Sequence, residues 1–379
     1  MGFWKTILPE TTTIDMLKKI LLIATVSAIG ISGYSQFHTL KLPQASNYVR
    51  ETQRLGVTDI TVEYSSPRAN ERDVWSDTNV IPQKGDPIPW RAGANMNTTI
   101  EFSTDVKIQG QVLKEGKYGF HVIPDGNSFQ LLFAHESNLW GSYYLDKEKD
   151  VTLKVDVSGE SCPFSEKMEF EFIPKSEDTM VIGLEWTEKR IPFEVSVDLN
   201  ETVVASLREE LRGINTYHWQ AWNDAAQWCL DRDTNLEEAY TWANRSIAGG
   251  YGGFAAAKNL SNLTTKARIA RKLGKEDEYK ETIEEALMAD FDEGMANQFA
   301  MYLIGEQEFD KSLAFTNKAT EKYPDTWYIS LNNSVSKYMV GKRKDAVKQA
   351  KGIEAPEWFR ERLQKIIGDM EEGTFELRG

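Results

Sequence analysis

The chain has 379 residues, of which 41% are hydrophobic and 27% are charged, the composition of an ordinary water-soluble protein. Because a single hydrophobic core rarely extends over so many residues, we expect two domains. The formal net charge is -14 and the sequence holds no basic stripe. Nucleic acid is therefore not expected as a partner, since a phosphate backbone is bound by clustered lysines and arginines.

The N-terminus has the layout of a secretory signal. A pair of lysines precedes a short apolar run over residues 20–31, and the small residues Gly33 and Ser35 stand just before Gln36. The apolar run is too short to make a comfortable membrane span. We therefore expect residues 1–35 to be a signal peptide with an upstream extension. The mature chain is then periplasmic or secreted, begins at Gln36 and has no membrane span.

Apolar and polar residues alternate with a period of two over residues 57–197, which is typical of strands with one buried face. Ile60, Val62 and Tyr64 form one such set, and the alternation returns several times further along the chain. About nine or ten strands with short turns are expected, the layout of an antiparallel β-sandwich or barrel. We predict a β-sandwich domain over residues 37–197.

Two connections inside this region can also be predicted. The turn Pro-Asp-Gly-Asn at 124–127 indicates a tight hairpin between residues 118 and 133, because Asp-Gly tolerates the positive φ angles of such a turn. A wide loop from Ser65 to Pro89 is rich in Pro, Asp and Asn and interrupts the strands.

After Val197 the period changes to that of helices, and we predict a helical-repeat domain over residues 198–379. The run Thr-Asn-Leu-Glu at 234–237 predicts a capping box at a helix start. Small and aromatic residues recur at matching helical positions in three successive segments. They are Tyr279, Thr282, Ala286 and Ala289, then Phe309, Ser312, Thr316 and Ala319, and then Ala346, Ala350 and Ile353.

This recurrence predicts an array of helical hairpins in which small residues let paired helices approach closely. Ser312 and Ala346 are 34 positions apart, the period of a tetratricopeptide repeat, whereas Thr282 and Ser312 are only 30 apart. The array is therefore expected to be irregular and only weakly tetratricopeptide-like.

Motifs that would carry chemistry are incomplete. Residues 135–139 begin like the zinc-protease signature but end in a leucine where the second histidine is required. Residues 231–235 begin like a calcium loop, yet Leu236 replaces the glycine needed at its bend, so a helix entry is expected instead. The glycine-rich run 249–253 lacks the Lys-Ser/Thr pair of a phosphate loop. We therefore predict no metal and no cofactor.

The only two cysteines are Cys162 and Cys229, which are expected in different domains. Export permits a disulfide, but two isolated cysteines do not make a disulfide framework. We favour two separate buried thiols over a pair.

The run Trp-Arg-Ala-Gly-Ala-Asn at 90–95 leaves the long loop and enters a strand. Further distinctive runs are Val62–Pro67, Gly116–Phe120, Ile123–Pro124 and Trp140–Gly141. Together they closely resemble the exported bacterial domain of unknown function 2911 family, over roughly Leu42 to Val197. The resemblance implies an all-β domain in an exported protein and brings no activity with it. The chain departs from the family pattern between Arg68 and Trp75.

Arg91 and Asn95 allow two interpretations. In the functional one, the guanidinium beside the amide holds a carboxylate or sugar hydroxyls at a loop rim, with Trp90 or Trp140 as a stacking floor. In the structural one, Arg91 pairs with Glu63 and Asn95 bonds the backbone at the strand entry. We favour the structural interpretation, because ion-pair networks are common and mimic binding sites.

Tyr64 and His121 complete the candidate ligand-binding residues, together with Trp90, Arg91, Asn95 and Trp140. His121 is predicted to point to the face opposite Tyr118 and Phe120, and a lone histidine is more often a core or surface residue than a ligand.

We therefore expect an exported, non-enzymatic binding protein, in which a β-sandwich takes a small polar ligand and the helical array contacts another protein. The alternatives are a carboxylate-dependent hydrolase or carbohydrate-active enzyme with its site at the loop 90–95, and a purely structural envelope protein. Convergence of Asp73, Asp77, Glu101 and His121 in one cleft would favour the enzyme, and their dispersal would favour binding.

Overall fold

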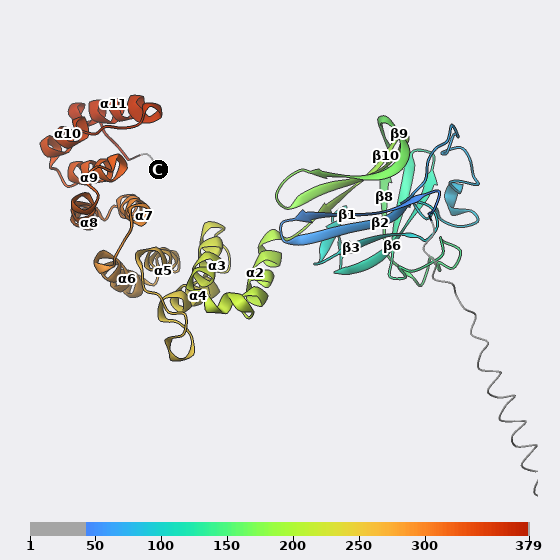
Figure 1. Cartoon of the computed structure of the whole chain (residues 1–379), viewed down its shortest axis with the longest axis horizontal. Coiled ribbons are helices and arrows are strands. Elements are labelled where there is room, and N and C mark those ends of the chain that lie inside the picture. The colour runs from blue at the N-terminus through green and yellow to red at the C-terminus, as the bar shows by residue number, and fades with distance from the viewer. Residues whose placement is uncertain (1–42, 378–379) are drawn as a thin grey trace, which may run out of the picture.

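The computed structural model describes residues 43–377, which form a β part and a curved helical part joined end to end (Figure 1). The expected signal peptide over 1–35 and the expected cleavage before Gln36 lie outside the described residues. Within 43–377, no helix combines the length and the apolar character needed to cross a membrane.

The β part consists of two antiparallel sheets. One sheet has the order β1-β2-β3-β6-β7-β8 and the other has the order β5-β4-β10-β9. The strands are β1 (Asn47–Leu55), β2 (Thr58–Ser66), β3 (Thr98–Phe102), β4 (Val106–Ile108), β5 (Gln111–Leu113), β6 (Gly116–Asp125), β7 (Ser128–Ala134), β8 (Val151–Ser158), β9 (Glu160–Pro174) and β10 (Thr179–Ser196). The predicted antiparallel strands, about nine or ten in number, are thereby confirmed.

The two sheets pack face to face through aromatic side chains. Phe120 of β6 lies 6.1 Å from Phe170 of β9 and 5.7 Å from Phe193 of β10, measured between ring centroids. Ile60 and Val62 of β2 are fully buried in the same core. Period-two alternation therefore places one set of side chains between the sheets and the other set on the outer faces.

The hairpin predicted from the Pro-Asp-Gly-Asn run is confirmed between β6 and β7. Asp125 pairs with Ser128, so the turn itself is Gly126-Asn127. Gly126 adopts φ 65°, the left-handed backbone that favours glycine at this position.

Ten α-helices follow among the described residues, and most of them pack as antiparallel pairs along the array. They are α2 (Leu199–Glu210), α3 (Trp219–Asp231), α4 (Leu236–Ala248), α5 (Leu260–Lys272), α6 (Glu276–Met288), α7 (Glu293–Gly305), α8 (Phe309–Lys322), α9 (Trp327–Met339), α10 (Arg343–Lys351) and α11 (Glu357–Glu372). The end of the described chain turns back to the inner side of the curve (Figure 1).

The recurring small residues lie where paired helices meet, as predicted. Thr282, Ala286, Ser312, Ala346 and Ala350 are all at most 1% exposed. The hydroxyl of Ser312 on α8 also lies 2.7 Å from the hydroxyl of Ser336 on α9. Close approach of helix backbones thus explains why small side chains recur at these positions.

The capping box predicted at 234–237 is wrong. The residue before α4 is Asn235, which has left-handed backbone with φ 51° and makes no capping bond with its side chain. Thr234 instead donates its backbone N–H to the carbonyl of Cys229 at 3.0 Å. The tight α3–α4 turn uses left-handed conformations at Asp233 and Asn235, and it leaves Thr234 one position too early to cap the helix.

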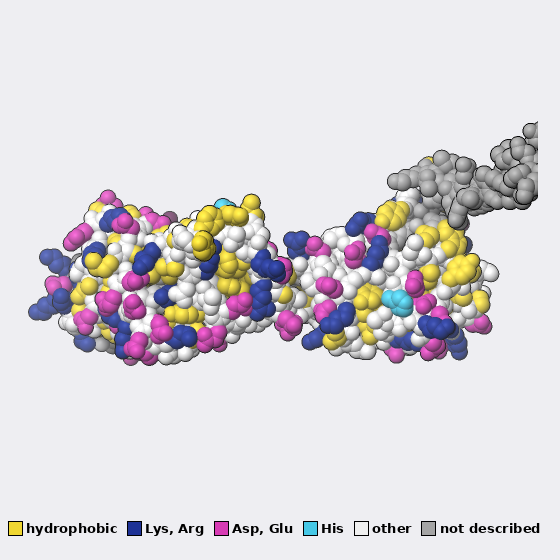
Figure 2. All heavy atoms as spheres, turned by 90° about the horizontal axis from the view of Figure 1, so that it is seen from below, with side chains coloured by type: hydrophobic (Ala, Val, Ile, Leu, Met, Phe, Trp, Pro, Cys, Tyr) yellow, Lys and Arg dark blue, Asp and Glu magenta, His cyan; other side chains and the backbone are white. Residues whose placement is uncertain are grey.

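The two parts meet at Asp198, whose carboxylate accepts a bond of 3.0 Å from the backbone N–H of Glu201 and caps α2. A second connection joins Arg232, after α3, to Glu177 in the β9–β10 turn through two bonds of 2.7 Å each. On the face seen in Figure 2, acidic and basic side chains are interspersed over both parts.

Candidate functional site

Trp90 leads the candidate loop into the sandwich core. Its backbone N–H and carbonyl both bond Val122 at 2.8 Å, so Trp90 lies beside β6 where β3 has not yet begun. Its ring stacks on Trp186 at 6.1 Å and meets Trp75 edge-on at 5.8 Å. Because Trp90 is only 3% exposed, it is a core residue and is not available as a stacking floor.

Arg91, one residue further along, belongs to the opposite face. Its Nη1 donates to the carbonyl of Asn95 at 2.6 Å, and its guanidinium carbon lies 5.3 Å from the centre of the Tyr143 ring. The loop that carries it uses left-handed backbone at Ala92 and Asn95, with φ values of 52° and 60°. Such conformations are rare outside glycine and persist where the surroundings hold them.

The ion pair expected between Arg91 and Glu63 is wrong. Glu63 pairs instead with Lys117 at 2.5 Å and with Arg50 at 3.3 Å. The register explains the difference, because Glu63 lies opposite Arg50 on β1 and opposite Thr99 on β3. Arg91 follows the Trp90–Val122 bridge and therefore lies farther along β6 than the row formed by Arg50, Glu63 and Thr99.

The backbone bonds expected of Asn95 are made by Asn97. Asn97 Oδ1 accepts from the N–H of Leu139 at 2.9 Å, and the N–H of Asn97 donates to the Leu139 carbonyl at 3.0 Å. The amide of Asn95 donates only to the hydroxyl of Ser65, at 3.2 Å. Asn95 and Asn97 stand two positions apart in the sequence, and only the fold shows that Asn97 is the one that bonds the backbone of Leu139.

His121 lies on the outer face of β6 and is completely buried. Its Nδ1 lies 2.6 Å from the hydroxyl of Ser142, while its Nε2 has no hydrogen-bond partner among the described residues. Burial, reinforced by the positive charge of Arg91, lowers the pKa of His121 from 6.5 to about 4. The imidazole is therefore neutral at physiological pH.

Segment 135–146 covers this outer face, and glycine allows the close approach. A Cβ at Gly141 would stand 2.5 Å from the guanidinium carbon of Arg91, and Gly141 itself has φ 68°. A Cβ at Gly119 would collide with the backbone carbonyl of Glu136. Glycine is therefore required at Gly141 and at Gly119 of β6 for the same reason, because segment 135–146 packs closely against Arg91 and β6.

The structure separates the six candidate residues into two groups. Tyr64 and Trp90 belong to the core, where the Tyr64 ring lies 4.9 Å from Phe170 and its hydroxyl donates to Glu51 at 2.9 Å. Arg91, Asn95, His121 and Trp140 belong to the outer face or the loops over it. Trp140 is 58% exposed, and the sequence analysis overlooked its exposed neighbours Tyr143 and Tyr144.

We call the set formed by Arg91, Asn95, Trp140, Tyr143 and Tyr144 the Arg91 surface. Tyr143 and Tyr144 are 61% and 77% exposed. Two consecutive tyrosines that follow Trp140-Gly141 after one serine are the sequence signal that could have identified them.

The residues proposed to distinguish an enzyme make separate contacts. Asp77 accepts bonds from the backbone and side chain of Asn79 within its own loop, and Glu101 lies opposite Lys117 in the sheet. Among residues 43–377, no hydrogen bond or ion pair joins Asp73, Asp77 or Glu101 to His121. No cluster of metal-ligating side chains is found in the described part of the chain, and Cys162 and Cys229 are unpaired.

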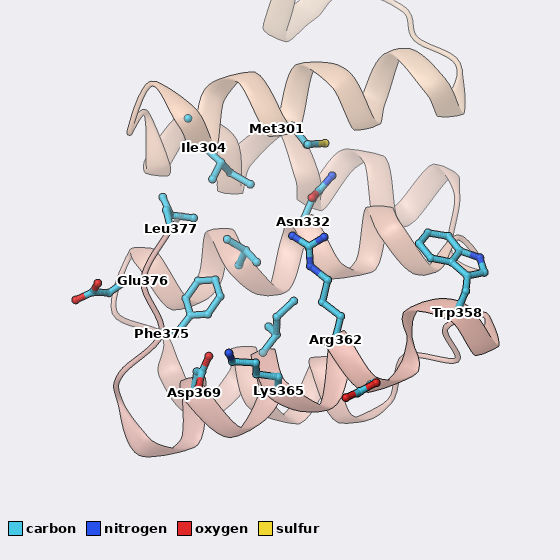
Figure 3. Close-up of a pocket in the computed structure, with 14 residues that line it drawn as sticks. Met301, Ile304, Asn332, Trp358, Arg362, Lys365, Asp369, Phe375, Glu376 and Leu377 are labelled. Carbon is cyan, nitrogen blue, oxygen red and sulfur yellow. The ribbon is translucent and has the colours of Figure 1, made fainter. Parts of the chain in front are cut away.

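A second surface lies in the helical part, in a groove of about 710 Å³ between α7, α9, α11 and residues 375–377 (Figure 3). We call it the helical groove. Ile304, Val335 and Ile366 supply apolar lining, and Met301 and Trp358 are 59% and 77% exposed. Arg362 points across the groove toward Asn332 in Figure 3.

Residues 375–377 form one side of this groove. Gly373 has left-handed backbone with φ 76°, and the N–H groups of Thr374 and Phe375 both donate to the carbonyl of Asp369, at 2.8 and 3.0 Å. The Phe375 ring then lies 5.4 Å from Tyr338, and Leu377 packs against the same apolar cluster.

Comparison with known proteins identifies the β part. Residues 46–195 match the model of the family described as "Protein of unknown function (DUF2911)". No curated protein matches the chain. A tetratricopeptide repeat protein from Parabacteroides merdae ATCC 43184, with a crystal structure at 2.39 Å resolution, is a distant structural match. It has 15% identity and a TM-score of 0.32, and the match covers 46% of this chain and 63% of that one.

The family model begins just before β1 and ends in the last residues of β10, so it covers both sheets of the sandwich. The chain therefore carries a DUF2911 domain at residues 46–195, followed by an array of helical hairpins.

Proposed function

We propose that this is an exported binding protein that holds a partner protein in the helical groove. The observation that carries the proposal is that residues 375–377, an extended segment near the end of the chain, pack two apolar side chains on the helices and form one side of the groove. A surface that accepts Phe-Glu-Leu from its own chain has the shape and polarity to accept a similar segment from another protein. Arrays of helix pairs present such extended surfaces to partners.

The charged residues of the groove indicate the composition of the partner segment. Arg362 and Lys365 on α11 line the groove, and within the described part of the chain neither takes part in an ion pair. Glu361, Asp369 and Glu376 line the groove as well, so its lining carries both signs of charge. The segment expected in the groove is therefore defined by its apolar side chains and not by a net charge.

Exposed apolar residues are the sites at which to test the proposal. Trp358→Ala removes a side chain that is 77% exposed at the groove, and Met288→Ala removes one that is 80% exposed on α6, outside the groove. We expect cross-linking of the full chain in the exported fraction to trap a partner that Trp358→Ala loses and Met288→Ala retains. Equal trapping by both variants would contradict a role for the groove.

The exported location is supported by the three-part layout of residues 1–35. An extracytoplasmic setting also suits a chain whose two thiols are unpaired and at least partly buried, because neither offers a freely exposed site for oxidation.

A further inference from the structure

The Arg91 surface has features that the groove does not explain. Arg91 is held in place by its bond to the Asn95 carbonyl and by contact with Gly141. A guanidinium has five N–H donors, and this bond uses one of them. Among the described residues no carboxylate pairs with Arg91, whereas Arg54 pairs with Asp59 and Arg190 pairs with both Glu185 and Glu171.

The aromatic residues beside Arg91 are displayed on a well-anchored segment. Leu139 is bonded to Asn97 in both directions, at 2.9 and 3.0 Å, and Ser142 is bonded to the buried His121 at 2.6 Å. These anchors lie on either side of Trp140. Trp140, Tyr143 and Tyr144 therefore stay 58%, 61% and 77% exposed on a backbone that the sheet holds in position.

Arg91 is the one charged residue among the five that form the Arg91 surface, and the buried His121 beside it is neutral. A lone guanidinium matches the two oxygens of a carboxylate through a pair of parallel hydrogen bonds. A phosphate would call for further cations or a run of backbone N–H groups, as at a helix N-terminus.

We propose that the Arg91 surface binds a carboxylate carried on a six-membered ring, with the guanidinium of Arg91 bonding the carboxylate and the rings of Tyr143 and Trp140 packing against a face of the ligand's ring. Two sources share this chemistry, an acidic sugar of the uronic type and an aromatic carboxylic acid. The site lies on the DUF2911 domain and is independent of the partner proposed for the helical groove.

Titration of the full mature chain by calorimetry tests this inference with four defined probes. They are a galacturonic acid trisaccharide and its neutral galactose counterpart, and benzoate and its neutral counterpart benzyl alcohol. A charge-assisted bond is worth enough that each binding acid should exceed its neutral counterpart by about tenfold or more in affinity. Binding of the trisaccharide alone identifies the sugar as the source, and binding of benzoate alone identifies the aromatic acid.

Three variants locate the site. Arg91→Lys keeps the charge but loses the paired hydrogen bonds, and we expect it to weaken binding about tenfold. Tyr143→Ala removes an exposed ring and should weaken binding by about threefold to tenfold without threatening the fold. Phe164→Ala is the matched control, since Phe164 is also 61% exposed but lies on β9 of the other sheet.

The outcomes that would overturn the proposal are equally definite. They are equal binding of acids and neutral probes, no binding of either acid, or an unchanged affinity in Tyr143→Ala. Should Arg91→Lys fold poorly, Trp140→Ala and Tyr143→Ala still decide the matter, because both side chains are more than half exposed. Trp358→Ala in the helical groove should leave this affinity unchanged, which separates the two proposals.

Discussion

At the scale of single residues, Arg91 illustrates how register decides which contacts a residue can make. Its residue type and position suggested an ion pair with Glu63. The bridge between Trp90 and Val122 instead places Arg91 near the far end of β6 from Lys117, the partner of Glu63. No local sequence pattern contains this information, because the bridge joins residues 32 positions apart. Because successive side chains in extended backbone point to opposite faces, Trp90 lies in the core and Arg91 lies on the outer face.

Arg91 and Glu63 therefore should not depend on each other for stability. We expect the effects of Arg91→Ala and Glu63→Ala on the free energy of unfolding to add within about 0.5 kcal/mol in the double variant, because the two residues share no partner. Urea denaturation of the parent, both single variants and the double variant measures this. A coupling energy above roughly 1 kcal/mol would mean that the two side chains do interact in solution.

His121 should make the stability of the β part depend on pH. Its pKa is about 4 in the fold and about 6.5 in the unfolded chain, so the unfolded state binds more protons between these values. Stability from this residue is therefore complete above pH 6.5 and is lost as the pH falls toward 4. The loss amounts to about 3 kcal/mol for a shift of this size.

The comparison that isolates this effect uses His121→Gln, which cannot take up a proton. Arg91 is the charged group that faces His121 and Ser142 is its polar partner, and both remain in the variant. Denaturation midpoints at pH 7 and pH 4.5 should fall less in His121→Gln than in the parent. Parallel changes in the two proteins would show that His121 is not buried in its neutral form.

At the scale of elements, much of the fold could be predicted from the period of the apolar residues. The strands, the Gly126-Asn127 hairpin and the buried small residues of α6, α8 and α10 all follow from local patterns. The start of α4 was mispredicted because Thr234 and Glu237 have the residue types and the spacing of a capping box. The tight turn places Asn235, in left-handed backbone, before the helix instead of Thr234. Local chemistry predicts elements better than their connections.

The candidate site residues stay a prediction, and their arrangement could be predicted only in part. The run at 90–95 contains Arg91, which packs on Gly141, the neighbour of Trp140. The aromatic residues Tyr143 and Tyr144 and the anchoring role of Asn97 depend on contacts between segments that are distant in the sequence. The helical groove was not predicted in detail, because its lining combines α7, α9, α11 and the chain end.

The segment 374–377 should behave as a removable side of the helical groove. Ending the chain at Gly373 removes Phe375 and Leu377, whose burial we expect to stabilise the fold by about 1–3 kcal/mol. Adding the peptide Thr-Phe-Glu-Leu should restore part of this and change the fluorescence of Trp358, which lies at the groove. A peptide with both Phe and Leu replaced by Ala is the control and should have no effect. Equal responses to the two peptides would contradict this role of the chain end.

At the scale of the whole molecule, three parts follow one another along the chain. A leading segment with the layout of a signal is followed by the DUF2911 sandwich and then by the helical array. Each part presents its own surface, the Arg91 surface on the sandwich and the helical groove on the array.

Export should remove residues 1–35. The small residues Gly33 and Ser35 suit the positions that signal peptidase reads before its cut, so we expect the mature chain to begin at Gln36. Intact-mass measurement of protein recovered outside the cytoplasm tests this. Recovery of a chain that retains the apolar run 20–31 would show that the segment has another role.

The ion pair between Arg232 and Glu177 joins the helical part to the sandwich, and we expect its strength to depend on salt. Both side chains are accessible to water, at 33% and 61% exposure, so mobile ions can compete for them far more easily than for the buried contacts of either part. We therefore expect the two parts to keep one relative orientation at low salt and to sample more orientations about Asp198 at high salt, where the ion pair is screened. Small-angle X-ray scattering over a range of salt concentrations would measure the distance between the two parts, and an unchanged distance would contradict this role of the ion pair.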